Sequence, residues 1–319
     1  NQHGTYRVKD EIAAVYSINS DGWNSTYASY NIDKVPGKFR IAIIGDSYIE
    51  ALSVNSDESI AEKLENTLGS DDFEVYRFGI SGAPMSQYLH MLRREVIKYR
   101  PDLVIVVLVH NDFDESYRFL KGSYGSNFMK IVIKDNNVSE VEPEEFIRPW
   151  YMPIRESATW RYLAYRQQVP YNRIKDIFLG NDAEYQANIS IASIATEKDL
   201  NKITTDYLFT EMKKACDNIG SKLLIVMDGD RKSIYNKMDP NVLYNKGALS
   251  LNLIAGEASG KNGIDFIDLH PFFEADYKEH RVKFDFKYDG HWNAYGHEIA
   301  AGVIYRHIKD SSILPHSLN

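Results

Sequence analysis

The sequence has only one cysteine, Cys216, among its 319 residues. A single cysteine excludes an internal disulfide and a zinc site built from several cysteines, so the fold depends on its hydrophobic core. Hydrophobic residues make up 44% of the chain, which is enough for a substantial core in a single α/β domain over residues 1–319. No two histidines have the HExxH spacing of zinc hydrolases, and we expect neither a metal ion nor another cofactor.

The chain also lacks long apolar runs and an excess of positive charge. No apolar stretch approaches the roughly 20 residues that span a bilayer, and the first residues, from Asn1 to Gly4, are polar. The chain does not begin with Met, so an export signal or anchor removed from its start stays an open possibility. Its 37 basic and 45 acidic residues give a net charge of -8. Nucleic-acid binding needs a concentrated basic face, so we expect no nucleic-acid partner.

Alternating strand and helix patterns predict a parallel sheet with helices on both faces. Buried strands are predicted over residues 39–45, 73–78, 103–109, 222–227 and 264–268. Helical spacing of apolar residues is found over residues 56–68, 85–99, 200–219, 244–259 and 293–308. The sequence therefore predicts a three-layer α/β/α fold with about five parallel strands, whose core covers about 38–112 and 200–310. Right-handed crossovers place all strand carboxyl ends at one edge, where ligands bind.

The segment between the two halves of the core, residues 113–199, loses this regular alternation. It contains several prolines and only short helical or strand-like stretches, and we interpret it as an insertion that forms a lid or a wall beside the site. Its aromatic side chains either stack on a sugar substrate or build a small local core. They are Trp150, Tyr151, Trp160, Tyr162 and Tyr165. The residues before Phe39 carry no pattern that we can assign.

Ser47 is the candidate nucleophile. It follows the first predicted strand in the tripeptide Gly45-Asp46-Ser47 and precedes a stretch that becomes helical. A serine at this turn presents its hydroxyl above the sheet, close to backbone N–H groups, as acyl transfer requires. The same tripeptide is also an ordinary turn and helix cap, so it is weak evidence by itself.

Near the C-terminus, Asp289-Gly290-His291 offers a base and an acid before the last predicted helix. A serine hydroxyl becomes a good nucleophile when a base removes its proton and a carboxylate orients that base. The alternative is that Asp289 or Asn293 caps the helix and His291 lies on the surface. Other candidates for these two roles are His110, His270, His297 and Asp285.

Acyl transfer also requires donors that stabilise a tetrahedral oxyanion. Gly82 follows the second predicted strand, and its N–H can approach the reacting group closely because glycine has no side chain. Asn111 follows the third strand and presents a side-chain amide donor. Each of the two residues is equally suited to an ordinary turn.

Taken together and in this order, Gly45-Asp46-Ser47, Gly82, Asn111 and Asp289 with His291 resemble the four sequence blocks of the SGNH/GDSL hydrolase family. The resemblance covers roughly residues 39–112 and 264–308. It implies a flavodoxin-like SGNH fold and a triad of Ser47, His291 and Asp289. It also implies an oxyanion hole formed by the N–H groups of Ser47 and Gly82 and the amide of Asn111.

The position of the acid departs from the usual family pattern, in which the aspartate lies three residues before the histidine. Here Tyr288 occupies that place and Asp289 lies two residues before His291. The form Asp-x-His-Trp is similar to the alginate O-acetyltransferase branch of SGNH-like proteins, which transfer acetyl groups to polysaccharide hydroxyls outside the cytoplasm. This similarity implies an extracytoplasmic location and, for a transferase, a membrane-bound partner that presents the acyl donor.

Three functions follow from these patterns. The leading hypothesis is a serine esterase that removes a small acyl group, such as acetyl, from a carbohydrate or a similar ester. An O-acetyltransferase acting on a polysaccharide is the alternative, because both reactions proceed through the same acyl-enzyme. The third is a noncatalytic flavodoxin-like binding module, which predicts that Ser47 and His291 lie too far apart to form a hydrogen bond.

Overall fold

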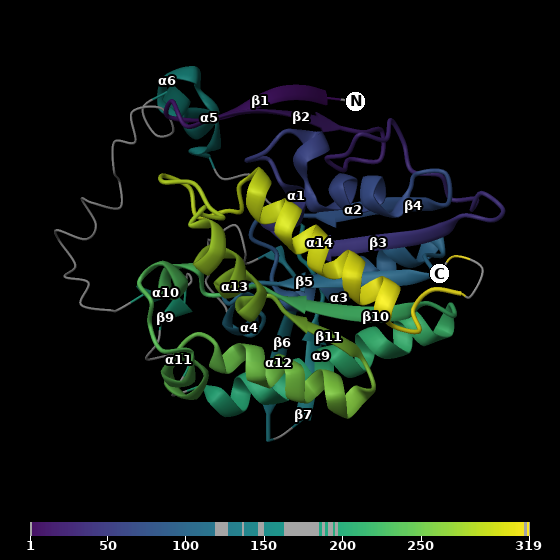
Figure 1. Cartoon of the computed structure of the whole chain (residues 1–319), viewed down its shortest axis with the longest axis vertical. Helices are drawn as coiled ribbons and strands as arrows, with labels where there is room; N and C mark the ends of the chain where they lie inside the picture. Colours follow the sequence, from purple (N-terminus) through teal and green to yellow (C-terminus); the bar gives the residue numbers. More distant parts are fainter. Residues whose placement is uncertain are drawn as a thin grey trace.

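The structure, a computed structural model, contains a five-stranded sheet in the middle of the molecule (Figure 1). It describes residues 2–118, 127–135, 137–145, 150–162, 185–186, 189–190, 194, 197–315 and 318. The strands of the sheet are β3 (Phe39–Gly45), β4 (Phe73–Gly79), β5 (Leu103–Leu108), β10 (Lys222–Met227) and β11 (Asp265–Asp268).

All neighbouring strands of this sheet are parallel, and their spatial order is β4-β3-β5-β10-β11. Numbered along the chain, this order is 2-1-3-4-5, the flavodoxin-like arrangement. The predicted fold class and number of strands are therefore confirmed. In such sheets the ligand crevice lies at the carboxyl ends of the strands where the winding direction reverses, which here is between β3 and β5.

The central strands are almost continuously apolar because both faces of the sheet are covered. Every residue of β3 is buried, and successive side chains contribute to different cores: Ile41 and Ile43 to one, Ala42 and Ile44 to the other. A strand that alternated polar and apolar residues would leave polar groups in one of the two cores.

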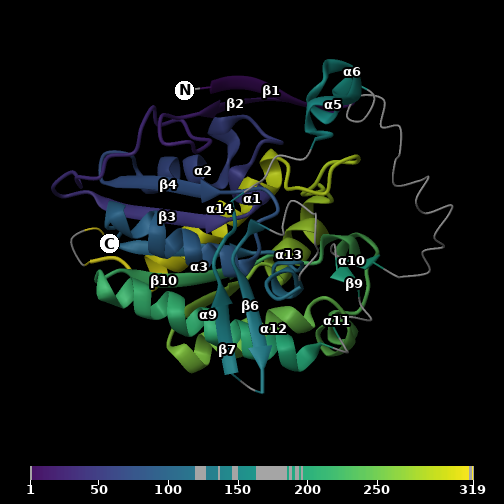
Figure 2. The ribbon, with the colours of Figure 1, turned by 180° about the vertical axis from the view of Figure 1, so that it is seen from behind.

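Two layers of helices enclose the sheet, as opposite views of the molecule show (Figures 1 and 2). One core includes residues of α2 (Ile60–Leu68), α13 (His270–His280) and α14 (Ala294–Asp310). The other includes residues of α3 (Met85–Arg94), α9 (Lys198–Asn218) and α12 (Ser250–Asn262). Shorter helical elements are α1 (Ser47–Glu50), η1 (Ser56–Glu58), η2 (Val96–Tyr99), α4 (Asp112–Glu115), α10 (Arg231–Tyr235) and α11 (Pro240–Lys246).

The prediction of one continuous helix over 244–259 is wrong, because the chain forms two helices there, α11 and α12. Gly247 ends α11 with an extended backbone, at φ -110° and ψ -166°. Glycine lowers helix stability because it loses more backbone entropy than other residues. In addition, a Cβ at Gly247 would lie 2.9 Å from the Cα of Leu243, so the backbone at 247 folds closely against the backbone of the last turn of α11.

The N-terminal residues form an antiparallel hairpin of β1 (Gln2–Val8) and β2 (Ile12–Ile18), which the sequence pattern does not predict. Val8, Ile12 and Ala14 form a small core of their own, and Phe286 packs against it. The carboxylate of Glu11 accepts hydrogen bonds from the backbone N–H groups at 287 and 288, at 2.6 and 2.8 Å. The hairpin therefore holds the loop that precedes Asp289.

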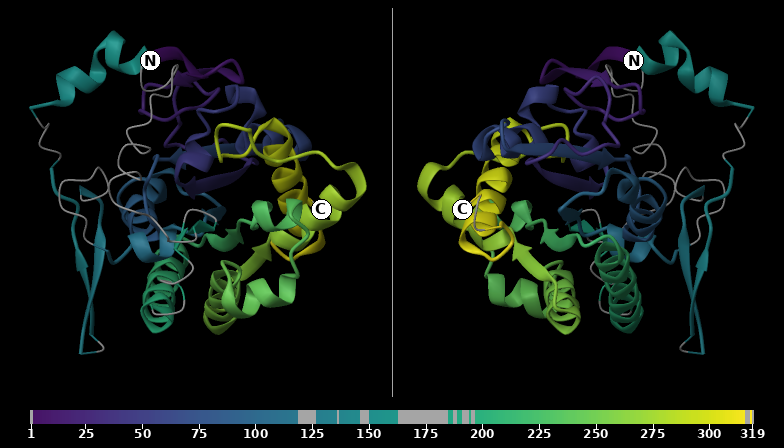
Figure 3. Two further views of the ribbon diagram at one scale, coloured as in Figure 1. Left: turned by 90° about the vertical axis from the view of Figure 1, so that its left-hand side faces the viewer. Right: turned by 90° about the vertical axis from the view of Figure 1, so that its right-hand side faces the viewer.

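The described parts of the predicted insertion contain short elements only. The hairpin of β6 and β7 lies at one side of the molecule (Figure 3). Trp150 has an exposed fraction of 84%, and Trp160 and Tyr162 are also exposed, while Tyr165 lies outside the described residues. The elements are β6 (Lys130–Lys134), β7 (Asn137–Val141), α5 (Met152–Glu156), α6 (Ala158–Arg161), β8 (Tyr185–Gln186) and β9 (Ile189–Ser190). Among the helices in the described residues, none is both long and apolar enough to cross a membrane.

Candidate active site

Ser47 is the first residue of α1, directly beyond the carboxyl end of β3. Asp46 caps this helix, because its Oδ1 accepts a hydrogen bond from the N–H of Tyr48 at 2.9 Å. The helix lies very close to the end of β4: a Cβ at Gly79 would be 2.0 Å from the backbone nitrogen of Glu50. The serine is therefore held at the edge of the sheet by a side-chain cap and by a contact that only glycine permits.

The structure brings Ser47, His291 and Asp289 into one hydrogen-bonded chain. The Oγ of Ser47 lies 2.7 Å from Nε2 of His291, and Nδ1 of His291 is hydrogen-bonded to Oδ1 of Asp289. With Nδ1 donating to the carboxylate, Nε2 is the acceptor for the serine proton. This distance contradicts the prediction of the binding-module hypothesis that the serine and the histidine lie too far apart.

The short spacing between acid and base is accommodated by the backbone. An antiparallel bridge pairs Asp285 with Trp292 and closes a loop between them. Within that loop, Oδ1 of Asp289 also accepts the backbone N–H of His291, at 2.9 Å. Because the carboxylate binds both the N–H and the ring of the residue two positions later, a second intervening residue is unnecessary. Asn293, not Asp289, caps α14, by accepting the N–H of Gly296 at 2.9 Å.

The charges around the histidine favour its role as a base. Burial alone lowers the pKa of His291, but the hydrogen bond and the negative charge of Asp289 raise it above the ordinary histidine value. Burial raises the pKa of Asp289, yet the hydrogen bonds from His291 outweigh this effect and hold the pKa below its usual value. Asp46 is more deeply buried, and its burial raises its pKa to about 6. The pair of Asp289 and His291 is thus arranged to stabilise an imidazolium.

The three candidate oxyanion donors lie at the same edge of the sheet, after β3, β4 and β5. In the described part of the chain, the backbone N–H groups of Ser47 and Gly82 have no hydrogen-bond acceptor. Gly82 has a φ of 72°, in the left-handed region that favours glycine. The amide of Asn111 donates to Oε2 of Glu115 at 3.2 Å, which uses one of its two N–H groups.

The competing histidines are buried and make contacts elsewhere. The Nε2 of His110 lies 3.0 Å from Oδ1 of Asn252, and burial lowers the pKa of His110. Burial also lowers the pKa of His270, at the start of α13. For His297, inside α14, burial lowers the pKa to about 3. These three rings are suited to packing roles and not to accepting a proton near neutral pH.

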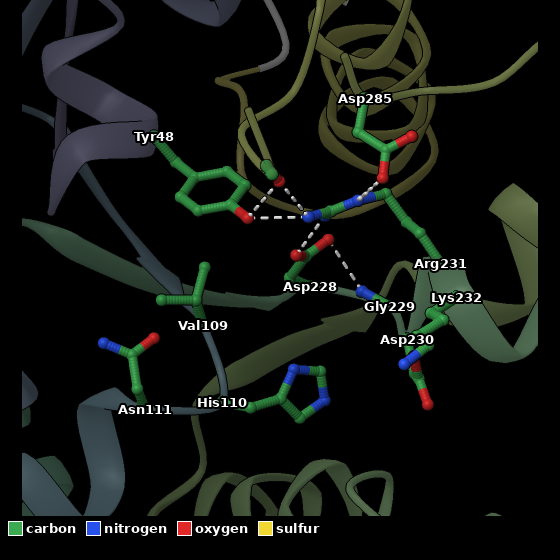
Figure 4. A pocket seen from close by; sticks show the side chains of 11 residues that line it. Tyr48, Val109, His110, Asn111, Asp228, Gly229, Asp230, Arg231, Lys232 and Asp285 are labelled. Carbon is green, nitrogen blue, oxygen red and sulfur yellow. Dashed lines mark hydrogen bonds and ion pairs between the residues drawn. The ribbon is translucent and has the colours of Figure 1, made fainter. Parts of the chain in front are cut away.

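Asp228, which directly follows β10, and Arg231, the first residue of α10, lie near the site and are not predicted by the sequence patterns. Nη2 of Arg231 donates to the hydroxyl of Tyr48 at 2.6 Å and to the carbonyl of Gly290 at 2.8 Å, and Nη1 pairs with Asp228. Asp285, the other candidate acid, faces this guanidinium at 3.9 Å (Figure 4). The signal that could have found them is their position, since they follow a predicted strand as Asn111 does.

A pocket of about 270 Å³ is lined by Tyr48, the residue after the candidate nucleophile, and by Asn111 (Figure 4). Its lining mixes polar and apolar surface and comes from the carboxyl ends of β5 and β10, from α10, from Tyr48 and from the loop of Gly290. The lining residues are Tyr48, Val109, His110, Asn111, Asp228, Gly229, Asp230, Arg231, Lys232, Asp285 and Gly290. The described residues contain no group of three or more His, Cys, Asp or Glu side chains that could hold a metal ion.

Comparisons with known proteins find similarity to one family model and to several solved structures. Residues 192–318 match a family model described as an SGNH hydrolase-like domain, acetyltransferase AlgX. No curated protein matches the chain. Similar solved structures include TesA, with 13% identity, a TM-score of 0.47 and coverage of 86% of this chain and 99% of that chain. A lipase/acylhydrolase from Enterococcus faecalis has 14% identity, a TM-score of 0.44 and coverage of 85% and 96%. A variant of an acetyl xylan esterase from Geobacillus stearothermophilus has 13% identity and a TM-score of 0.46, and the match covers 85% of this chain and 95% of that chain.

Proposed function

We propose that this chain, whose residues 192–318 match an SGNH hydrolase-like domain, is a serine esterase of the SGNH hydrolase superfamily that removes a small acyl group from a carbohydrate or a similar ester. The observation that carries the proposal is the hydrogen-bonded chain from Ser47 through His291 to Asp289, with 2.7 Å between Oγ and Nε2. This is the arrangement that general-base activation of a serine requires.

In the proposed reaction, the Oγ of Ser47 attacks the carbonyl carbon of the ester while its proton passes to Nε2 of His291. Asp289 stabilises the resulting imidazolium through Nδ1. The N–H groups of Ser47 and Gly82 and the amide of Asn111 donate to the tetrahedral oxyanion, each worth about 3 to 4 kcal/mol. When the intermediate collapses, the bond to the alcohol oxygen breaks and the alcohol leaves with the proton of His291. The acyl group then remains on Ser47.

A second nucleophile completes the cycle. Water gives up a proton to His291 and attacks the acyl-enzyme. The bond between the acyl carbon and Oγ then breaks, the carboxylic acid leaves, and His291 returns the proton to Oγ, which regenerates Ser47. The pocket beside Tyr48 supports a hydroxyl-rich leaving group, because the carboxylate of Asp285 and the ammonium group of Lys232 can hydrogen-bond to sugar hydroxyls. The exposed ring of Trp150 is a candidate for stacking on a longer glycan.

O-acetyl transfer is the second candidate function, and a specific observation favours it. The description of the family model that residues 192–318 match names an acetyltransferase. In this version a sugar hydroxyl replaces water in the second step, and a membrane-bound partner presents the acyl donor. An extracytoplasmic location belongs to the same proposal.

The test is incubation of the protein with an acetylated oligosaccharide, with and without an unacetylated oligosaccharide of different mass. Release of free acetate supports the esterase, and acetyl groups on the added acceptor support the transferase. Ser47→Ala abolishes either product. Ser70→Ala, an exposed serine in the connection between α2 and β4, is the matched control and keeps wild-type turnover. Absence of both products with the wild-type protein, together with an unmodified Ser47, contradicts the proposal.

A further inference from the structure

We propose that Arg231 and Asp228 are positioning residues that hold Ser47 and His291 in the relative position needed for proton transfer. This inference rests on the proposed function of the triad. It concerns an ion pair that contributes no atom to the triad but is hydrogen-bonded to the residue after Ser47 and to the residues before and after His291. Neither residue belongs to the four sequence blocks that point to the family.

The pair joins three segments of chain that are far apart in the sequence. Arg231 donates to the hydroxyl of Tyr48, the residue that follows the nucleophile, and to the carbonyl of Gly290, which lies between acid and base. The Tyr48 hydroxyl in turn donates to the same Gly290 carbonyl, at 2.9 Å. The nucleophile's helix and the loop of the base are thus tied to each other through one guanidinium.

Asp228 extends this network to the other side of the histidine. Its Oδ1 accepts a hydrogen bond from Nε1 of Trp292, the residue after His291, at 3.1 Å, and also from the N–H of Gly229 at 2.8 Å. The Trp292 ring is fully buried and lies 5.2 Å from the Tyr48 ring. The residues on both sides of His291 are therefore attached to the end of β10, which leaves the histidine loop little freedom to move away from Ser47.

The burial of the pair separates this role from substrate binding. The exposed fraction is 10% for the Arg231 side chain and 4% for the Asp228 side chain. Both Nη groups of Arg231 already donate to protein oxygens, and its Nε is buried and faces the carboxylate of Asp285 at 3.9 Å without a hydrogen bond. The charge is therefore compensated by protein carboxylates, whereas an arginine placed to bind an anionic substrate would present an exposed donor edge.

The planar fork of arginine suits this site better than lysine does. One guanidinium nitrogen bonds to Asp228 while the other bonds to Tyr48 and Gly290, so two fixed directions are used at once. An ammonium group is a single point with a shorter reach and cannot reproduce this geometry. Arg231→Lys therefore keeps the charge and loses the alignment, which separates the two contributions.

The positive charge has a second, measurable consequence. The charged groups that act on His291 are Asp289 and Asp46, which raise its pKa, and Arg231, which lowers it. Activity needs neutral His291 and is lost as the pH falls through its pKa. Arg231→Met removes the lowering contribution, so the acidic limb of the pH-rate profile moves to higher pH. Tyr48→Phe keeps all these charges and leaves the limb in place.

The experiment compares wild type, Arg231→Met, Arg231→Lys and Tyr48→Phe in p-nitrophenyl acetate hydrolysis. We expect Arg231→Met to lower kcat about 10- to 100-fold with KM changed less than about threefold, since small misplacement of reacting groups costs about this much. Arg231→Lys restores the acidic limb of the profile but not kcat. Tyr48→Phe lowers kcat about threefold to tenfold by the same argument. Arg306→Met, at an exposed position of α14, is the matched control and keeps wild-type values.

Several results would overturn the inference. An unchanged kcat in Arg231→Met, or a raised KM with kcat unchanged, assigns the arginine no role or a role in binding. If Arg231→Met does not fold, Tyr48→Phe decides, and an unchanged kcat in that variant rejects the positioning role. Failure of the proposed function is recognised separately, because then the wild-type protein itself shows no turnover and a fluorophosphonate does not label Ser47, and the inference falls with it.

Discussion

Replacement of Asp289 by Asn tests the part of the site that departs most from the family pattern. The change keeps the shape of the side chain but removes its negative charge. In the wild type, one oxygen of Asp289 is bound to both the backbone N–H and the ring Nδ1 of His291. An asparagine that turns its oxygen to the backbone N–H can still orient the loop, but it does not stabilise an imidazolium as a carboxylate does.

The magnitude follows from the two roles of the acid. Loss of tautomer control and of imidazolium stabilisation in a serine triad lowers kcat by roughly 10³- to 10⁴-fold, which corresponds to about 4 to 5.5 kcal/mol of transition-state free energy. The pH dependence has a definite sign. Asp289 raises the pKa of His291, so its removal lowers that pKa and the acidic limb of the kcat profile moves to lower pH.

The assay is the pH dependence of kcat for p-nitrophenyl acetate in wild type and Asp289→Asn, with thermal melts of both. Asp265→Asn, an exposed aspartate of β11, is the matched control. A well-folded Asp289→Asn protein with less than a tenfold loss of kcat and an unmoved acidic limb would refute the assignment of Asp289 as the acid.

Three further predictions concern the support of the site. Gly79→Ala places a Cβ 2.0 Å from the backbone nitrogen of Glu50 and should cost about 1 to 3 kcal/mol of stability and most of the activity. Gly260→Ala, with nothing within 4 Å of the added Cβ, should lower neither stability nor activity. Equal melting curves for the Gly79→Ala and Gly260→Ala proteins would contradict the close contact at Gly79. The folded-state pKa of His297 lies well below its ordinary value, so its contribution to stability is present above about pH 6.5 and decreases at lower pH. From about pH 7.5 to about pH 5 in urea unfolding, wild type should lose about 2 kcal/mol more than His297→Gln, and parallel losses contradict this. Glu11→Ala frees the loop that carries the acid and should lower kcat about threefold to tenfold with KM unchanged; a wild-type kcat argues against support by the hairpin.

The sheet could be predicted from the sequence because burial on both faces leaves a clear signal. The run from Phe39 to Gly45 is apolar throughout except for Arg40, and that arginine is buried against Glu74, with its Nε 2.9 Å from the carboxylate. The N-terminal hairpin left no such signal, because only Val8 of β1 is buried and the strand contacts little of the main core. Its position depends on long-range contacts that a local pattern does not encode.

The triad could be predicted because its residues come at strand ends and before a helix, where short motifs are visible. Arg231 could not, since Asp228-Gly229-Asp230-Arg231 has the composition of an ordinary turn. Its importance comes from a partner 183 positions away, Tyr48, and from one 59 positions away, Gly290. Only the fold brings these three segments together.

The most direct test of the central claim is to look for an acyl group on Ser47. The protein is mixed with p-nitrophenyl acetate, quenched in acid within one turnover and digested for mass spectrometry. The account predicts that the peptide containing Ser47 gains the mass of one acetyl group, and that His291→Ala and Ser47→Ala do not gain it. Turnover by the wild-type protein with an unmodified Ser47 would contradict the claim that this serine is the nucleophile.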